Sequence, residues 1–341
     1  MANNITKNQH YVPRCVLKHF TTNGKTHINN FSFSDESLEG KNIEKVCALK
    51  YFYGKEQDIE KIYGLSKDDM AKILDEKLTK GDVNVTQEEM VHIKAFIGAQ
   101  STRTPNDTKL VNDVAKGTID ALLKLKEVEN IPEYRVEMND RRNKVENLKI
   151  GIIKTGSFCH MDLVLLKSSI CSQFIVGQDP VIECNPFLWK REKINNKGLA
   201  YYGYTIIMPI SSKYCICLYD TNVYKKLGKN GIKKLNYFET KEINLFQVLN
   251  SDEYVLLNES NKKVKENKII STIENGQIHN SMNNSNRVPL AHCFKITKKT
   301  DSLNTKQLEY CIRPEVKDSE YFFETKINEL IEQKKNTKGS I

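Results

Sequence analysis

The hydrophobic residues of the first 130 positions recur mostly at helical spacing. From about Asp58, apolar residues repeat every three or four positions, which is the period of an amphipathic helix. Ser66 with Asp69, and Thr86 with Glu89, have the spacing of a capping box, in which each side chain accepts a hydrogen bond from the other residue's backbone N–H. We predict a helix after each pair, the second of them ending near residue 103.

Three further elements of this region follow from local signals. Pro13 suits the first turn of a short helix, because the backbone N–H that proline lacks would be unpaired there. Thr104 and Pro105 have the residue types of an N-cap and a first helical position, which predicts a helix to about residue 129. Residues 26–33 alternate partly between apolar and polar side chains, which predicts a strand.

Beyond Pro132 the pattern changes to short apolar runs rich in β-branched residues. These runs predict strands, several of them buried: LKIGII, MDLVLL, QFIVG, YTIIMPI and YCICLY. Helical spacing returns over residues 243–258, and the polar, Asn-rich residues 259–287 predict a loop. A strand near residues 290–296 and a helix over residues 320–334 complete the predicted elements.

The order of these elements predicts an α+β fold. We expect a helical N-terminal half packed on a β-rich C-terminal half that contains a mixed or antiparallel sheet. The change in pattern divides the chain into a mainly helical region, residues 1–130, and a β-rich region with closing helices, residues 131–341. The two regions are either separate domains or one integrated domain.

Composition adds a charge signal to this picture. The chain has 52 Lys and Arg against 43 Asp and Glu, which gives a net charge of +9. An excess of positive charge favours a polyanionic partner, so we expect a nucleic acid or a phosphorylated small molecule. The alternative is that the Lys-rich and Asn-rich composition reflects an AT-rich genome, in which case the charge says nothing about function.

The sequence also predicts a cellular compartment. The N-terminal MANNITKNQHYVP lacks the apolar core of a signal peptide, and no stretch approaches the roughly 18 apolar residues of a transmembrane helix. The nine cysteines are an odd number without a tight framework, which is typical of reduced thiols. We therefore expect a cytoplasmic protein without a membrane partner.

The first candidate for chemistry is the polar string around Pro13. His10 titrates near neutral pH and is a candidate general acid or base. Arg14 is able to hold a phosphate or a carboxylate through two parallel hydrogen bonds, and Gln9 and Tyr11 are candidate substrate-binding residues. The alternative is structural: His10 caps a turn and Arg14 forms an ion pair.

The second candidate lies on the helix predicted over residues 86–103. His92, Phe96, Gln100 and Arg103 are spaced so that they share one helix face. A guanidinium on a face with Phe96 is semi-buried and needs a partner. Arg103 is either a further phosphate or carboxylate contact, or it bonds the carbonyls of the helix end.

The third candidate is Asp179, which follows a predicted buried strand. Active-site carboxylates often lie on such loops, because the sheet holds them rigidly. Asp179 is a candidate to bind a metal, to orient His10 or to pair with an arginine, whereas the structural alternative is an Asx turn before Pro180. Glu183 follows, but the residue two positions beyond it is Asn185, where a restriction-type nuclease core would have lysine.

Cofactor motifs are weak throughout the sequence. It contains no CxxC or HxxxH pair, no Walker A loop, no GxGxxG and no serine nucleophile elbow. No metal-ligand cluster is predicted, and the cofactor stays unknown. A divalent metal is compatible with the hypothesis for Asp179.

The opening string QHYVPRCVLKHF resembles the signature of a bacterial family, domain of unknown function number four-two-three-eight. Three later landmarks match in the same order: FIGAQSTRTP resembles the family's helix ending in Arg-Thr-Pro, FIVGQDPV its strand ending in Ser-Asp-Asn-Pro, and MPISS its Pro-Leu-Ser-Pro turn. INLFQVLNSDEYVL resembles its closing helix. The resemblance covers about residues 8–260 and adds Ser211 and Asn250 as candidate substrate-binding residues.

The resemblance implies a bacterial intracellular protein and supplies no activity. In an alignment without gaps, Asp179 lies one position later than the family's acid, which reverses its side-chain direction if the strand continues. The other signature residues coincide with candidates already found from spacing. This coincidence favours a functional interpretation of them.

We expect an enzyme that acts on a phosphodiester or phosphorylated substrate, with a nuclease as the first hypothesis and a role as an antiphage defence or toxin effector. In this hypothesis His10 is the general acid or base, and Arg14 and Arg103 stabilise the phosphate charge. Gln100 orients the substrate, and Asp179 positions His10 or a metal. The rival is a non-catalytic nucleic-acid-binding or regulatory module whose signature residues form a closed structural network.

Overall fold

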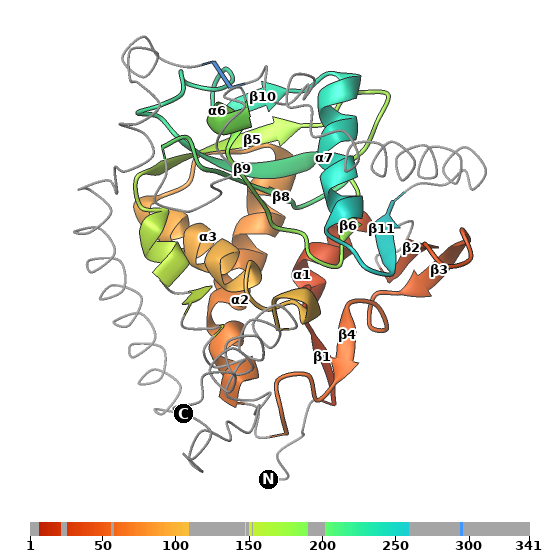
Figure 1. The fold of residues 1–341 in the computed structure, drawn as a ribbon. Helices are drawn as coiled ribbons and strands as arrows, with labels where there is room; N and C mark the ends of the chain where they lie inside the picture. The colour runs from red at the N-terminus through yellow and green to blue at the C-terminus, as the bar shows by residue number, and fades with distance from the viewer. Residues whose placement is uncertain are drawn as a thin grey trace, which may run out of the picture.

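The computed structural model of the protein describes residues 7–21, 26–55, 58–108, 147, 150–151, 153–189, 202–258 and 294–295. In these ranges the strands form three sheets and the helices pack around them, so the fold is α+β as predicted (Figure 1). None of the helices in these ranges combines the length and the apolar content needed to cross a membrane.

The largest sheet is mixed and has five strands. Its order is β10-β5-β9-β8-β7, with β10 parallel to β5 and every other pair antiparallel. Three of these strands come from the predicted runs MDLVLL, YTIIMPI and YCICLY. The bounds are β5 Met161–Lys167, β7 Ile182–Cys184, β8 Thr205–Pro209, β9 Tyr214–Asp220 and β10 Ile232–Lys234.

Strands from the two ends of the described chain meet in a second sheet. Its order is β3-β2-β11-β6, and all its pairs are antiparallel. A separate pair joins β1 to β4, also antiparallel. The bounds are β1 Asn8–His10, β2 His27–Ser32, β3 Leu38–Asn42, β4 Ala48–Lys50, β6 Val176–Gly177 and β11 Tyr254–Leu257.

These strands change the expected division of the chain. Four of them, β1 to β4, lie within the first 50 residues, and β2 pairs with β11. A helical N-terminal half packed on a β-rich C-terminal half is therefore not confirmed. The physical reason is that the backbone N–H and C=O groups along both edges of β11 need hydrogen-bond partners. The N-terminal strand β2 supplies these partners along one edge. The predicted boundary near residue 130 lies outside the described residues.

The helices confirm one predicted start and correct another. α3 begins after Thr86, whose Oγ1 accepts from the Glu89 backbone N–H at 3.1 Å, so the predicted capping box is present. Ser66 lies inside α2, so a helix start at that residue is wrong. The bounds are α1 Arg14–Leu17, the 3₁₀ turn Lys18–Phe20, α2 Asp58–Glu76, the 3₁₀ turn Leu78–Lys80, α3 Gln87–Gln100, α6 Pro186–Trp189 and α7 Tyr237–Leu249.

Two further predictions are corrected by tertiary packing. The run LKIGII was predicted as a strand, but its described residues and residues 153–157 are helical. Gly151 there approaches Gly98 of α3 so closely that a Cβ on Gly151 would lie 2.9 Å from the Gly98 carbonyl oxygen. Residues 243–258 were predicted as one helix, but α7 ends at Leu249 and β11 follows.

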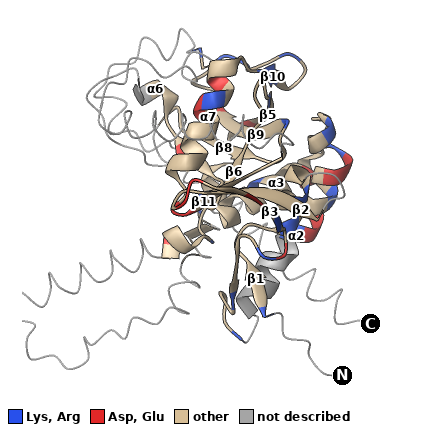
Figure 2. Cartoon of the chain, turned by 90° about the vertical axis from the view of Figure 1, so that its right-hand side faces the viewer, with Lys and Arg blue, Asp and Glu red and all other residues tan. Residues whose placement is uncertain are grey.

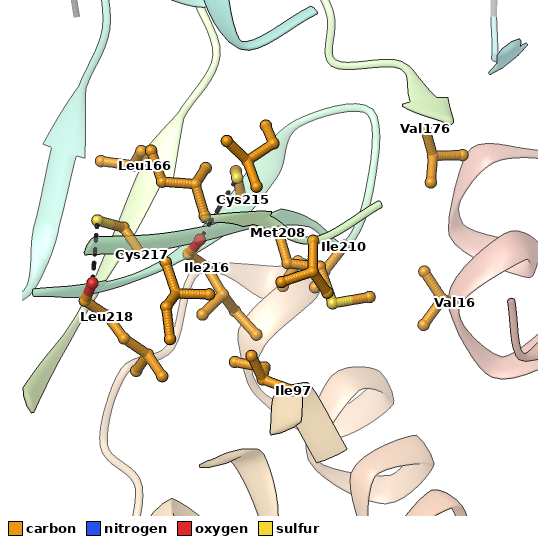
Figure 3. Close-up of a cluster of buried hydrophobic side chains, with 14 of the residues drawn as sticks. Val16, Ile97, Leu166, Val176, Met208, Ile210, Cys215, Ile216, Cys217 and Leu218 are labelled. Atoms are coloured by element: carbon orange, nitrogen blue, oxygen red, sulfur yellow. Dashed lines mark hydrogen bonds between the residues drawn. The ribbon is translucent and has the colours of Figure 1, made fainter. Parts of the chain in front are cut away.

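One hydrophobic cluster connects the elements and extends from Tyr11 to Phe294. Figure 3 shows Ile97 of α3 pointing toward Ile216 of β9, which places α3 against the five-stranded sheet. Every residue of β9 is buried, as expected for a central strand covered on both faces. Residues 9–20, which we call the signature segment, join this core, because Val16, Leu17 and Phe20 are fully buried.

Candidate functional site

Gln9 is fully buried and fixes the turn that follows β4. Its Nε2 donates to the backbone carbonyl of Gly54 at 2.9 Å, and its Oε1 accepts from the backbone N–H of Tyr53. Both ends of the amide are therefore satisfied inside the protein, as buried polar groups generally are. This arrangement gives Gln9 a structural role in the turn after β4, and its substrate contact stays a prediction.

Gln100 and Arg103, at the end of α3, hold the backbone of the signature segment. Gln100 Nε2 donates to the Tyr11 carbonyl at 3.0 Å, and Arg103 Nη2 donates to the His10 carbonyl at 2.7 Å. Arg103 Nε also donates to the Tyr53 hydroxyl at 2.9 Å, and its guanidinium lies 5.4 Å from the centre of the Tyr53 ring. The structure brings these residues together, but these contacts are to backbone carbonyls and a phenol within the protein.

The side chains of His10 and Arg14 lie nearer the surface. Arg14 is more than half exposed and pairs with Glu44 at 3.3 Å. His10 Nε2 lies 3.0 Å from the Ile43 carbonyl, which identifies Nε2 as the hydrogen-bearing nitrogen when the ring is neutral. Burial is the main cause that lowers the pKa of His10, and the neighbouring cation of Arg14 lowers it further. His10 is therefore neutral at pH 7.

Tyr11 connects the signature segment to the loop that carries Asp179. Its hydroxyl lies 3.1 Å from the hydroxyl of Tyr254, and Gln178 Nε2 donates to it at 3.3 Å. Gln178 Oε1 in turn accepts from the backbone N–H of Glu253 at 2.8 Å. Gln178, the residue directly before Asp179, is thus held by Tyr11, which follows β1, and by the backbone at the start of β11.

The C-terminal end of α7 clamps the rest of this loop. The loop is residues 177–181, and its backbone bonds to three side chains of α7 and the turn after it. Every residue of the loop except Asp179 forms one of these hydrogen bonds. The contacts are Gly177 N to Gln247 Oε1 at 2.8 Å, Gln178 N to Ser251 Oγ at 3.0 Å, Gln247 Nε2 to Pro180 O at 3.0 Å, and Asn250 Nδ2 to Val181 O at 3.5 Å.

The Asp179 side chain differs from its clamped neighbours. It forms no hydrogen bond and no ion pair with the described residues. Burial raises its pKa well above the ordinary aspartate value, and the nearby carboxylates of Asp107 and Glu183 raise it further. A rigid loop therefore holds one carboxyl group in an environment that disfavours its charge.

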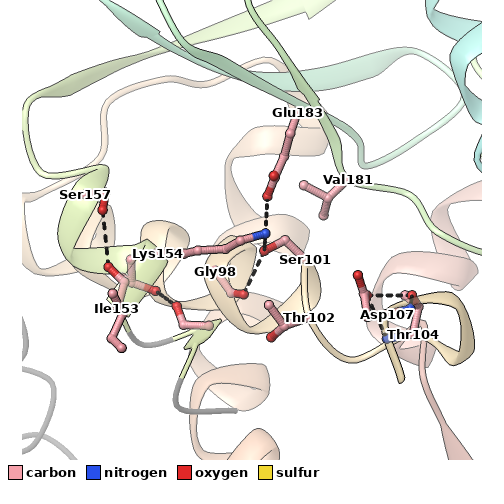
Figure 4. A network of polar contacts seen from close by, with 12 residues as sticks. Gly98, Ser101, Thr102, Thr104, Asp107, Ile153, Lys154, Ser157, Val181 and Glu183 are labelled. Atoms are coloured by element: carbon pink, nitrogen blue, oxygen red, sulfur yellow. Dashed lines mark hydrogen bonds and ion pairs between the residues drawn. The ribbon is translucent and has the colours of Figure 1, made fainter. Parts of the chain in front are cut away.

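Lys154 supplies the positive charge of this centre. Its Nζ donates to Glu183 Oε1 at 2.6 Å and lies 3.4 Å from Ser101 Oγ at the end of α3 (Figure 4). Asp107 accepts from the Thr104 hydroxyl at 2.6 Å, and burial raises its pKa as well. We call Asp107, Asp179, Glu183 and Lys154 the acidic centre.

Tyr204 borders the acidic centre just before β8. It is 1% exposed, and burial followed by the charge of Glu183 raises its pKa well above the ordinary tyrosine value. Its hydroxyl thus remains protonated at neutral pH. Sequence reasoning missed Tyr204, Asp107 and Lys154 as site residues, because no spacing connects them to Asp179.

The two remaining predicted residues have different surroundings. Ser211 is buried, and its Oγ accepts from the backbone N–H of Tyr214 at 2.9 Å, which shapes the turn between β8 and β9. Asn250 lies at the Asp179 loop, where it bonds Val181, and its carbonyl accepts from Asn106 at 3.4 Å. Asn250 is therefore near the acidic centre, and Ser211 serves the turn.

The acidic centre predicts a pH dependence of stability. Because the folded-state pKa values of Asp179 and Asp107 are raised, the native state binds more protons than the unfolded state above about pH 4. The stability these groups contribute is present below that pH and is lost as pH rises through their raised pKa values. We expect the urea midpoint of Asp179→Asn, relative to wild type, to increase between about pH 4 and about pH 8. A constant difference across that range would contradict the raised pKa of Asp179.

Within the described ranges, no three side chains of His, Cys, Asp or Glu are already arranged to hold a metal ion. The acidic centre contains three carboxyl groups: Glu183 pairs with Lys154, and burial raises the pKa of Asp179 and of Asp107.

Residues 8–261 match the model of a family described as "Protein of unknown function (DUF4238)". The matched range contains the signature segment, the end of α3, the Asp179 loop and α7. No curated protein and no solved structure matches the chain.

Proposed function

Since the chain belongs to the family "Protein of unknown function (DUF4238)", whose description names no reaction, we propose a function from its geometry: hydrolysis of phosphodiesters, with Asp179 at the reacting centre. The observation that carries this proposal is the Asp179 carboxyl group. Its neighbours on both sides are clamped, while the group itself is unpaired among the described residues and has a pKa raised well above its ordinary value. Perturbed pKa values of this kind gather at functional sites.

The two best-defined carboxyl groups of the centre have opposite environments. Asp179 favours the protonated form, and Glu183 forms an ion pair with Lys154 at 2.6 Å. A carboxyl group that favours its protonated form, near a carboxylate that is paired with a lysine, suits a reaction that needs both an acid and a base. In the proposed reaction Asp179 donates a proton to the leaving oxygen, and Glu183 accepts one from the attacking water.

Lys154 and a divalent cation supply the charge that a phosphate substrate requires. Mg²⁺ commonly binds through one or two carboxylates together with substrate phosphates, so a complete cage of protein ligands is not needed. A bound cation would offset repulsion between the carboxylates and the phosphate. The Lys154 ammonium, held by Glu183 and Ser101, is positioned to stabilise negative charge on the phosphate oxygens.

In this proposal the signature residues act as a scaffold. Gln9, Gln100 and Arg103 fix the backbone around Tyr11, and Tyr11 holds Gln178 beside Asp179. The net charge of +9 supports a polyanionic substrate, for which we propose a nucleic acid. The setting we propose is that of a bacterial cytoplasmic nuclease acting in defence or as a toxin effector.

The second candidate function is a non-catalytic binding or regulatory module. The observation that favours it is the use of the Gln9, Gln100 and Arg103 side chains in hydrogen bonds to the backbone and to Tyr53. A module of this kind would keep the scaffold and would not need the unpaired Asp179. The acidic centre therefore separates the two functions.

The full chain should be incubated with labelled single-stranded DNA, single-stranded RNA and bis(p-nitrophenyl) phosphate, with Mg²⁺, with Mn²⁺ and with EDTA. We expect cation-dependent hydrolysis of at least one of these phosphodiesters. Binding of the oligonucleotides without hydrolysis under every condition would overturn the enzymatic proposal and support the module.

A further inference from the structure

A second surface lies at the opposite end of α7 from the Asp179 loop. It combines exposed apolar side chains with lysines that come from neighbouring strands. Figure 2 shows basic positions around β10 and the adjoining end of α7. We call this the lysine–aromatic surface; its members are Lys167, Ile170, Lys213, Lys234, Tyr237 and Phe238.

The sheet register places the basic side chains in one row. Lys234 of β10 is opposite Lys167 of β5, and Lys167 is opposite Tyr214 of β9. Lys213 directly precedes Tyr214, and its ammonium lies 5.5 Å from the centre of the Tyr214 ring. Since adjacent strands are about 4.8 Å apart, the row forms a cationic band across three strand ends.

The apolar side chains beside this band are unusually exposed. Ile170 is fully exposed and Phe238 is 65% exposed. The ring centres of Tyr237 and Phe238 are 5.5 Å apart at an interplanar angle of 78°. The Ser169 backbone N–H donates to Thr240 Oγ1 at 3.1 Å, so the Ile170 loop and the start of α7 are joined.

The acidic residues of the same helix end face inward. Glu239 is buried, and its carboxylate accepts from the Asn236 backbone N–H at 2.7 Å as part of the helix cap. Glu242 is buried too. The surface therefore presents positive charge and aromatic rings together, without these two carboxylates.

We propose that the lysine–aromatic surface binds single-stranded nucleic acid, with the bases on the aromatic rings and the phosphates on the lysine row. Sequence-tolerant proteins of this kind combine a basic track with aromatic side chains on which bases stack. The proposal rests on the proposed function, because it assigns a docking surface to the same nucleic acid that the acidic centre would cleave.

The position of α7 supports this occupant. The helix has 13 residues, so its two ends are about 20 Å apart at 1.5 Å per residue. One end carries Tyr237 and Phe238, and the other clamps the Asp179 loop. A strand several nucleotides long reaches from one to the other. A row of lysines beside aromatic rings fits a polynucleotide, which offers regularly spaced phosphates and bases that stack. A protein that binds a lipid surface depends more on buried apolar area than on an ordered row of charges.

The test is fluorescence anisotropy with a labelled oligo(dT) of about 20 nucleotides, longer than one typical binding track. Each variant of the full chain tests one part of the proposal. Lys167→Glu combined with Lys213→Glu should weaken binding at least about tenfold and reduce the salt dependence. Phe238→Ala should weaken binding about fivefold or more with the salt dependence unchanged, because stacking is lost and charge is kept. Lys72→Glu combined with Lys80→Glu changes the net charge by the same amount at exposed positions of α2 and the 3₁₀ turn after it; this matched control, the Lys72 control, should bind nearly as wild type.

Two outcomes would overturn the docking surface. One is that the Lys72 control weakens binding as much as the double variant, which would show a diffuse effect of net charge. The other is that wild type binds vesicles of phosphatidylcholine and phosphatidylserine but not oligo(dT), with vesicle binding lost in Phe238→Ala. Hydrolysis of bis(p-nitrophenyl) phosphate distinguishes this proposal from the function, because the surface variants should hydrolyse it normally. If the chain binds oligo(dT) but hydrolyses none of the phosphodiesters, the proposed enzymatic function is wrong and the proposed docking surface is kept.

Discussion

Asp179→Asn is expected to abolish phosphodiester hydrolysis without loss of stability. The amide has the shape of the carboxyl group but cannot donate the proton, so we expect a fall in kcat of about 10²-fold to 10⁴-fold. The same change removes a carboxyl group whose ionised form the fold disfavours, so the free energy of unfolding at pH 7 should rise by about 1 kcal/mol. Rates and urea unfolding curves of one preparation measure both effects.

The matched control for this variant is Asp68→Asn on the exposed face of α2. It makes the same substitution and should change neither quantity. A normal rate in Asp179→Asn would remove the reacting centre from the proposal. An unfolded Asp179→Asn would instead give Asp179 a structural role, contrary to its lack of partners among the described residues.

Arg103→Ala is expected to destabilise the protein by about 3 kcal/mol. The guanidinium is buried and donates to the His10 carbonyl and to the Tyr53 hydroxyl, so truncation leaves both acceptors inside the protein without that donor. It also removes the contact with the Tyr53 ring at 5.4 Å. Urea unfolding of the full chain measures the loss.

Arg14→Ala provides the comparison within the same signature. Its ion pair with Glu44 is exposed on both sides, and such pairs contribute little. We expect a change below about 0.5 kcal/mol. Equal losses for the two arginines would contradict the distinction between a buried scaffold arginine and a surface one. Loss of hydrolysis in a fully stable Arg103→Ala would restore the phosphate-binding role expected from the sequence.

The sequence predicted the elements whose signals are local. The Thr86–Glu89 cap predicted the start of α3, and the run YCICLY predicted β9. The run LKIGII was misassigned because a short apolar run fits a buried helix as well as a strand. The helical segment lies so close to Gly98 of α3, about 50 residues earlier, that a Cβ on Gly98 would lie 2.6 Å from the Gly151 carbonyl oxygen.

The residues that meet at the signature segment were predictable from spacing, whereas most of the acidic centre was not. Spacing placed Gln100 and Arg103 on one face, and the structure brings both against the signature segment. Both side chains donate to backbone carbonyls, which every residue carries and no sequence pattern distinguishes. Lys154 was not predictable, because it lies in a helical segment that meets Glu183 only in the folded chain.

The carboxyl titration of Asp179 tests the central claim most directly. Carbonyl-¹³C NMR of the full chain, with Asp179→Asn to assign the signal, follows that one group across pH. We expect a midpoint well above the ordinary aspartate value of about 3.9, because the carboxyl group must be protonated to act as the general acid. A midpoint near 3.9 would contradict the proposal.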